Sequence, residues 1–233
     1  MALADDGPLA LGLAQRRLGL IKAEMAAAAQ KAGRDPAEVA LLAVSKTFSA
    51  EAVATLHAAG QRDFGESYLK EAQGKVEALP QANWHFIGHL QTNKARFAPG
   101  LFSCLHSLDS LELAEKLSQR LLEKGLTLSA YVQVNVSGEA AKSGIGPAEL
   151  PAFLVGLAQF PAIKPIGLMA MPPYDPDPEK SRPHFRALRR LRDEKAPKLK
   201  GLSMGMSGDF QVAIEEGATV VRIGTALFGD RGH

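Results

Sequence analysis

The feature that most constrains this chain is a repeated alternation of short apolar runs with segments of helical length. The first run, Val39–Val44, has Asp35-Pro36 before it and Lys46-Thr47 after it. A continuous apolar run of this length is typical of a parallel strand buried on both faces. Seven more candidate strands follow: Asp63–Gly65, Trp84–Gly88, Phe102–Ser107, Ser129–Val136, Ile163–Met169, Gly201–Met204 and Thr219–Ile223.

One helix is predicted before the first strand and one between each pair of consecutive strands. They are Leu9–Lys31, Ser49–Gly60, Tyr68–Leu79, Thr92–Phe97, Ser110–Lys124, Pro147–Gln159, Pro183–Lys195 and Gly208–Glu215. Such alternation forms an open doubly wound sheet or a closed barrel. Eight units, with no Gly-x-Gly-x-x-Gly after the first strand, favour an α/β protein with a (β/α)8 TIM barrel. We expect one domain over residues 1–233, with residues 1–8 flexible and the first helix added at the bottom or side of the barrel.

Composition excludes several classes of protein. The chain is 46% hydrophobic and its 27 basic and 25 acidic residues give a net charge of +2, which excludes a disordered chain and argues against a dedicated nucleic-acid binder. The single cysteine, Cys104, excludes a disulfide framework and resembles a small core residue. No apolar run approaches a membrane span, and Asp5 and Asp6 stand where a secretory signal carries positive charge. A cytoplasmic protein without membrane partners is expected.

Two further patterns are interpreted as structural. The basic stretch from Arg182 to Lys200 is interspersed with acidic residues and predicts a solvated helix face rather than a nucleic-acid site. The histidines show no metal-ligand spacing, so no metal site is predicted. They are His57, His85, His89, His106, His184 and His233.

Lys46 directly follows the first strand, at the end where barrel enzymes place functional groups. Partial desolvation at a barrel mouth favours the neutral amine, which can attack a carbonyl. The alternative is a strand-end lysine that reaches water or pairs with a carboxylate. Position alone leaves both open.

Two later strand ends carry groups suited to an anion. Ser207 lies in a Gly/Ser turn before a helix, where backbone N–H groups and a hydroxyl suit a phosphate, although Asp209 could cap that helix without any ligand. On the last strand, alternation places Arg222 and Gly224 on one face and Thr225 on the other. Gly224 lets a ligand approach the backbone. A buried Arg222 needs an acceptor, either from a ligand or from a structural salt bridge.

Taken together, these residues indicate one cofactor. Barrels often hold phosphate with the loops after strands seven and eight, which here carry Ser207, Gly224 and Thr225. An amine on strand one, a phosphate site and an arginine able to face a ring nitrogen match the needs of pyridoxal 5′-phosphate (PLP). A phosphate-sugar enzyme without PLP would need the phosphate site but not both Lys46 and Arg222.

Motifs along nearly the whole chain match a known family. They are Leu42–Thr47, Phe64–Glu66, Trp84–Gly88 with Leu90–Lys94, Lys142–Ile145, Gly167–Met169, Leu202–Ser207 and Val221–Thr225 with Phe228-Gly229. With these motifs the chain closely resembles the YggS/PROSC family, PLP homeostasis proteins with an alanine racemase-like barrel (PLP fold type III).

The resemblance implies that Lys46 forms an internal aldimine with PLP. It implies that Ser207, Gly224 and Thr225 hold the phosphate and that Arg222 faces the pyridine nitrogen.

It further implies that Met169 and His85, on neighbouring strands, line the pocket. Ser67 stands where the family has asparagine, so a polar contact near the cofactor is expected to be shorter or absent. His89 replaces a common proline, which leaves the rigidity of its turn open. The proline-rich loop 171–183 is a candidate lid.

Two features favour binding over turnover. An arginine on the ring nitrogen keeps that nitrogen unprotonated and the ring a weaker electron sink. The chain ends at His233, soon after the eighth expected strand, so the second domain of alanine racemases is not expected. We therefore expect a monomeric PLP carrier or buffer with no catalytic residue, and with PLP-requiring apoenzymes as transient partners. The alternative is a small PLP-dependent racemase or lyase.

Overall fold

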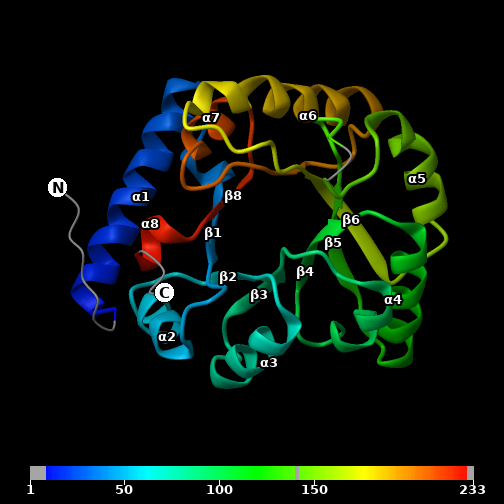
Figure 1. The fold of residues 1–233 in the computed structure, drawn as a ribbon, viewed down its shortest axis with the longest axis horizontal. Coiled ribbons are helices and arrows are strands. Elements are labelled where there is room, and N and C mark those ends of the chain that lie inside the picture. The colour runs from blue at the N-terminus through cyan, green and yellow to red at the C-terminus, as the bar shows by residue number, and fades with distance from the viewer. Residues whose placement is uncertain (1–8, 140–141, 230–233) are drawn as a thin grey trace.

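The fold is a closed barrel of parallel strands surrounded by helices (Figure 1). The computed structural model describes residues 9–139 and 142–229, so the segment 1–8, expected to be flexible, lies outside it. Within those ranges, eight strands follow one another around the barrel in sequence order, and β8 pairs with β1 to close it. The predicted α/β barrel is confirmed.

The strands lie within a few residues of their predicted positions. They are β1 (Ala40–Val44), β2 (Asp63–Glu66), β3 (Asn83–Phe86), β4 (Cys104–Leu108), β5 (Leu128–Gln133), β6 (Ile163–Met169), β7 (Gly201–Ser203) and β8 (Val220–Ile223). The α-helices are α1 (Leu11–Lys31), α2 (Ala50–Ala58), α3 (Leu69–Ala78), α4 (Leu111–Glu123), α5 (Leu150–Leu157), α6 (Arg182–Lys195), α7 (Phe210–Glu215) and α8 (Thr225–Phe228).

Short 3-10 helices complete the list: η1 (Pro36–Glu38), η2 (Thr92–Phe97), η3 (Pro147–Glu149) and η4 (Pro178–Ser181). The helix predicted between β3 and β4 is therefore the 3-10 helix η2.

Capping fixes several helix starts. The hydroxyls of Ser49 and Ser110 accept backbone N–H groups of α2 and α4 at 3.2 Å, which satisfies donors that have no partner within the helix.

The added helix α1 packs on the side of the barrel, against α2, α7 and α8 (Figure 1). Ala14, Leu18, Ile21 and Met25 form its buried face. At its C-terminal end, Lys31 Nζ lies 2.6 Å from Glu215 Oε1. Of the two positions expected for this helix, the structure selects the side.

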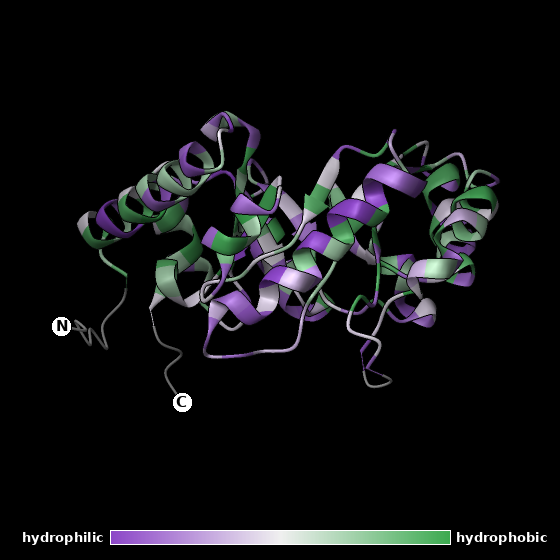
Figure 2. Ribbon diagram, turned by 90° about the horizontal axis from the view of Figure 1, so that it is seen from above, coloured by the Kyte–Doolittle hydropathy of each residue, from purple (hydrophilic) through white to green (hydrophobic). Residues whose placement is uncertain are grey.

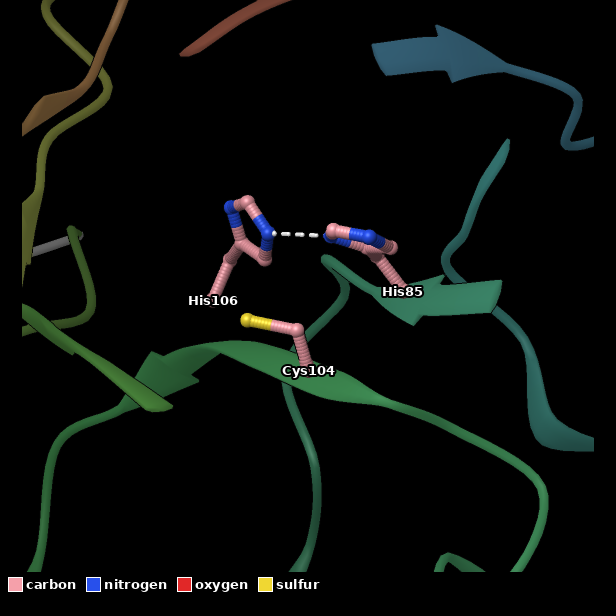
Figure 3. A group of neighbouring side chains, drawn as sticks. All are labelled: His85, Cys104 and His106. Carbon is pink, nitrogen blue, oxygen red and sulfur yellow. Dashed lines mark hydrogen bonds between the residues drawn. The ribbon is translucent and has the colours of Figure 1, made fainter. Parts of the chain in front are cut away.

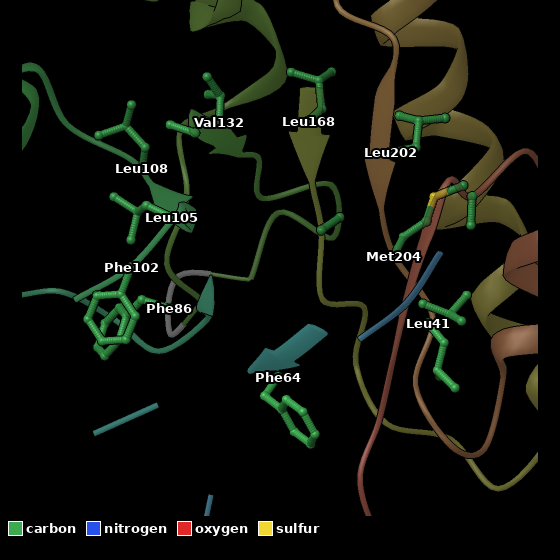
Figure 4. Packing of buried hydrophobic residues seen from close by; sticks show 14 of the residues in the cluster. Leu41, Phe64, Phe86, Phe102, Leu105, Leu108, Val132, Leu168, Leu202 and Met204 are labelled. Carbon is green, nitrogen blue, oxygen red and sulfur yellow. The ribbon is translucent and has the colours of Figure 1, made fainter. Parts of the chain in front are cut away.

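Most of the apolar core lies between the strands and the helices, in a layer that we call the outer shell. Figure 4 shows part of this layer, with side chains from successive strands β1 to β7. Phe64 and Phe86 are fully buried there. Phe64 also packs against Trp84, with ring centroids 5.5 Å apart.

The barrel interior contains a smaller apolar group formed by Leu42, Cys104, Tyr131, Met169 and Val220. These side chains point to the barrel axis because strand alternation sends every second residue inward. Three polar residues are buried with them: His106, Ser203 and Arg222. Barrel interiors are usually filled by bulky branched apolar side chains, so the polar share of this one is unusual.

The basic stretch on α6 is engaged in ion pairs. Seen from above in Figure 2, α6 crosses the front of the molecule and is largely hydrophilic. Arg182, Arg186 and Arg189 lie 2.8–3.3 Å from carboxylate oxygens of Glu216, which is itself buried. These contacts support the interpretation of α6 as a structural helix. In the described part of the chain, no helix is both long and apolar enough to span a membrane.

Candidate functional site

A cavity of about 890 Å³ opens at the carboxyl ends of the strands. Residues that follow β1, β3, β6, β7 and β8 line it, as expected for a barrel. Five of the seven predicted site residues are among them: Lys46, Ser207, Arg222, Gly224 and Thr225. The structure therefore brings together residues that are up to 179 positions apart in sequence (225 − 46).

Lys46 lies in a tight turn after β1. Phe48 N–H donates to the carbonyl of Ser45 at 3.1 Å, and Thr47 has a φ of 72°. That conformation is strained for a β-branched residue and persists only when its surroundings enforce it. Part of that support comes from Glu71 on α3, whose carboxylate accepts the Thr47 N–H at 2.5 Å.

A buried lysine holds this turn from behind. Lys75 Nζ donates to the Ser45 carbonyl at 2.6 Å, to Glu66 Oε1 at 2.7 Å and to Glu71 Oε1 at 2.6 Å. Ser45 Oγ also donates to Glu66 Oε1 at 2.6 Å. Burial raises the pKa of Glu66, which Lys75 and Ser45 partly oppose. This network was not predicted from the sequence, although the helical spacing of Glu71 and Lys75 is a signal for one of its pairs.

The hydroxyls of Ser207 and Thr225 converge although they follow different strands, β7 and β8. Their oxygens lie 3.5 Å apart. The Ser207 turn is closed by Asp209, whose carboxylate accepts the Met206 N–H at 2.7 Å. Gly224 packs closely against the end of β1, because a Cβ there would lie 3.3 Å from the carbonyl oxygen of Val44.

One detail of the predicted alternation on β8 is wrong. The strand ends at Ile223, and Thr225 is the first residue of α8. Thr225 therefore does not follow the two-residue period that would place it on the opposite face from Arg222. The change from strand to helix at Gly224 lets Arg222, Gly224 and Thr225 line the same cavity.

Arg222 lies at the inner end of the cavity and is 4% exposed. Its Nη1 donates to Ser203 O and to Ser203 Oγ, both at 2.7 Å, and its Nη2 donates to the carbonyl of Ala170 at 3.0 Å. Burial lowers the pKa of Arg222 to about 10, which leaves the guanidinium charged at neutral pH. A buried cation held by neutral acceptors favours an anionic or electron-rich ligand nearby.

His85 and Met169 do not lie on neighbouring strands, which corrects that expectation. His85 is on β3 and Met169 on β6, with β4 and β5 between them. Met169 belongs to the apolar group of the barrel interior and His85 contacts His106, and neither is among the residues that line the cavity. Their expected contact with a ligand stays a prediction.

The structure also gathers a group that spacing along the chain did not reveal. His85, Cys104 and His106 point toward one another, with their potential ligand atoms within 4.8 Å (Figure 3). His85 Nδ1 lies 2.9 Å from His106 Nε2. Burial raises the pKa of Cys104 to about 12, which makes it a poor nucleophile at neutral pH. The group could have been predicted from the inward positions of its three residues on the adjacent strands β3 and β4.

The two departures from the family pattern, Ser67 and His89, also line the cavity. Gly88 packs directly on the backbone of Ser67, where a Cβ would come within 2.3 Å of the Ser67 carbonyl oxygen. Ser107 Oγ donates to the Gly88 carbonyl at 2.6 Å. The turn before His89 is therefore fixed by its neighbours. The loop after β6 contributes Tyr174, which is 84% exposed, to the rim; its role as a lid stays a prediction.

Comparison with known proteins gives a consistent result. The family model for the alanine racemase N-terminal domain matches residues 17–232. The chain is 50% identical to the pyridoxal phosphate homeostasis protein of Pseudomonas aeruginosa over 91% of this chain and 94% of that protein. It is 39% identical to the protein of the same name from Escherichia coli over 93% and 96%.

Solved structures agree with this result. PipY of Synechococcus elongatus, solved with PLP bound, is 36% identical, with a TM-score of 0.80 over 93% of this chain and all of that one. Alanine racemase from Corynebacterium glutamicum is 18% identical, with a TM-score of 0.68 over 91% of this chain and 62% of the enzyme. The similarity to alanine racemase shows the fold alone.

Proposed function

The chain belongs to the alanine racemase N-terminal domain family and, within it, to the pyridoxal phosphate homeostasis proteins, and from this premise we propose that it binds PLP in the cavity at the carboxyl ends of the strands. One observation carries the proposal. Lys46, Ser207, Arg222 and Thr225, which follow or lie on three separate strands, line that single cavity.

The residues present fit this cofactor chemically. PLP needs an amine for its aldehyde, donors for its phosphate and a partner for its ring nitrogen. The cavity offers the Lys46 amine, the converging hydroxyls of Ser207 and Thr225, and the Arg222 guanidinium. Gly224 lines the cavity with its backbone alone.

When bound, PLP supplies an aldehyde that a lysine amine can take up and release. We assign that amine to Lys46, held in place by the strained turn and by Lys75 behind it. Ser207 and Thr225 donate hydrogen bonds to the phosphate, and Gly224 allows it to approach the backbone. Arg222 donates to the ring nitrogen.

The same assignment accounts for a carrier rather than an efficient enzyme. A guanidinium donates hydrogen bonds and cannot accept them, so a ring nitrogen that pairs with Arg222 carries no proton and withdraws electrons weakly. We propose that the protein buffers PLP and delivers it to PLP-requiring apoenzymes, as a monomer. Turnover of an amino acid well above the rate with free PLP would contradict the carrier role.

The attachment residue can be tested directly. After incubation with PLP and reduction with borohydride, mass spectrometry should find a pyridoxyl group on Lys46. Lys46→Ala should lose both this adduct and the absorbance of the bound cofactor. Lys94 lines the same cavity, so Lys94→Ala is a matched control that should keep both. A label on another lysine, or unchanged absorbance in Lys46→Ala, would reject the assignment.

Delivery can be tested separately by mixing the loaded protein with an apoenzyme that requires PLP. The recovery of enzyme activity should exceed that seen with an equal concentration of loaded protein sealed behind a dialysis membrane. Equal recovery in the two arms would show release into solution rather than direct transfer.

A further inference from the structure

A continuous series of polar side chains crosses the barrel interior beneath the cavity. Arg222 Nη1 lies 2.7 Å from Ser203 Oγ, which lies 2.8 Å from His106 Nδ1. His106 Nε2 lies 2.9 Å from His85 Nδ1, and His85 Nε2 lies 3.6 Å from Asp63 Oδ1. We call these five residues the relay. It joins β8, β7, β4, β3 and the start of β2, so it runs from the cavity toward the opposite mouth of the barrel.

Counting donors and acceptors fixes the direction of the hydrogen bonds. Arginine only donates and a carboxylate only accepts. A neutral His85 that faces the Asp63 carboxylate carries its proton on Nε2, so its Nδ1 accepts. A neutral His106 then donates to His85 from Nε2 and accepts at Nδ1 from the Ser203 hydroxyl. Ser203 Oγ in turn accepts from Arg222.

The environment supports the neutral form of His106. It is fully buried, and burial, together with the nearby His85 and Arg222, lowers its pKa well below the usual value. His85 is less enclosed, with 17% of its side chain exposed, and it faces Asp63, whose pKa its hydrogen bond lowers. Of the two rings, His85 is therefore the one that reaches solvent and faces a carboxylate, and we assign an added proton to it.

One added proton reverses the direction of the central bonds. His85 then carries protons on both nitrogens and donates from Nδ1 to His106 Nε2. His106 stays neutral by carrying its single proton on Nδ1, from which it donates to Ser203 Oγ. Ser203 Oγ now accepts from both His106 and Arg222, and its own hydrogen no longer has His106 Nδ1 as its acceptor. The count is balanced: the two rings hold two protons before the change and three after it.

We propose that the relay is a one-proton switch that transmits the protonation of His85 to Arg222 beneath the cofactor. In the neutral state Ser203 donates to His106. This bond makes Ser203 Oγ a stronger acceptor for Arg222, because hydrogen bonds in a series polarise one another. In the protonated state Ser203 is shared between two donors and holds Arg222 less firmly. The consequence for the cofactor rests on the proposed function, whereas the reversal within the relay does not.

Three titratable residues besides Arg222 face the two histidines. Asp63 on β2 faces His85, and Cys104 lies beside both rings on β4. Tyr131 on β5 packs against His106 with ring centroids 4.5 Å apart. Burial raises the pKa of Tyr131 to about 12 and that of Cys104 to about 12, so both stay neutral while a histidine titrates.

A metal ion held by His85, Cys104 and His106 is the competing interpretation of this group. The hydrogen bonds favour the relay, because each ring nitrogen already faces a polar partner. The buried cation of Arg222, near enough to His106 to lower its pKa, also opposes a metal ion bound to the His106 ring.

The first experiment examines the full chain without cofactor, by long-range ¹⁵N–¹H NMR of its histidine side chains. At pH 8 both His85 and His106 should show the Nε2–H tautomer. As the pH falls, His85 should gain a proton while His106 changes to the Nδ1–H tautomer over the same range. An Nδ1–H tautomer of His106 at pH 8, an unchanged tautomer at low pH, or a metal ion bound to the isolated protein would each overturn the proposal.

The second experiment follows the absorbance of bound PLP against pH. The wild-type protein should show a one-proton transition that His85→Gln abolishes. Ser203→Ala should keep the histidine titration seen by NMR but lose the transition in absorbance, since it separates Arg222 from the histidines. His184 on α6 lies outside the relay, so His184→Gln should retain both. A transition that survives in Ser203→Ala would reject the coupling to Arg222.

The two readouts separate the two proposals. If no variant or wild-type protein binds PLP, the proposed function fails, and the tautomers still decide the existence of the switch. If PLP binds and the tautomers do not reverse, the switch fails and the binding function stands.

Discussion

The two faces of the barrel strands are buried to a similar degree but differ in chemistry. The faces turned to the helices carry Phe64, Leu105 and other apolar side chains of the outer shell. The faces turned to the axis include His106, Ser203 and Arg222, each at most 4% exposed. A buried polar group is costly unless its hydrogen bonds are satisfied, whereas apolar burial stabilises in proportion to area.

The difference indicates a division of roles. The outer shell supplies stability, because it can be filled with any apolar side chains of suitable size. The interior is committed to a particular set of hydrogen bonds that ends at the cavity. Substitutions in the shell should therefore lower the free energy of unfolding more than they weaken PLP binding. Substitutions in the interior should weaken PLP binding more than they lower the free energy of unfolding.

The largest effect on stability is expected for Phe64→Ala. Phe64 is fully buried and packs against Trp84 and His57. Removing a buried phenyl ring costs about 3–5 kcal/mol, from lost burial and from the cavity left behind. Urea unfolding measures the change. Val155 is 73% exposed, so Val155→Ser should change stability by less than about 0.5 kcal/mol. If Phe64→Ala lowered the free energy of unfolding as little as Val155→Ser, the outer shell would not be the source of stability.

A smaller effect is expected for Lys75→Met, at the one described place where the shell itself holds a buried ion pair. The variant leaves the Glu66 carboxylate buried without its cation, at a cost of about 3 kcal/mol. Because burial raises the pKa of Glu66 above its unfolded value, the folded variant holds its proton more tightly. Its stability should then be greater at pH 5 than at pH 8, as shown by urea unfolding at both.

The double variant Glu66→Gln with Lys75→Met removes both charges and is the control for that prediction. It should recover part of the loss and show no such fall with rising pH. If the double variant were as unstable as Lys75→Met, the cost would come from packing rather than from the unpaired carboxylate.

The smallest effect is expected for Glu215→Gln, which removes a partly exposed contact between α7 and its neighbours α1 and α6. Hydrogen bonds from Lys31 and then Arg182 hold the pKa of Glu215 below its usual 4.5. The folded pKa is therefore lower than the unfolded one, so this contribution is present above about pH 4.5 and is lost as the pH falls through the folded value. The variant should lose less than about 1 kcal/mol at pH 7.

Thermal unfolding at pH 7 and pH 3 tests the predicted direction of this pH dependence. Glu194→Gln, on the exposed face of α6, is the matched control. The difference between Glu215→Gln and the wild-type protein should shrink at pH 3. A difference that grows at low pH would show that the contact acts through packing instead.

The sequence was sufficient to predict the barrel and five of the residues that line the cavity. Lys46 and Ser207 each lie in a turn that follows an apolar strand, and local patterns of this kind are legible along the chain. Thr225 was placed on the wrong face because the end of β8 at Ile223 depends on how Gly224 turns the backbone. Lys75 was missed because its partners Ser45 and Glu66 lie on other elements.

The amino-acid sequence by itself determined the number and order of the strand–helix units and the residues that follow each strand, because hydrophobic period and turn chemistry are local properties. Only the tertiary structure decided which inward-facing residues meet. Asp63, His85, His106, Ser203 and Arg222 come from five strands. Closure of the sheet into a barrel brings them into one series, since side chains on the inner faces of distant strands can touch only across the axis.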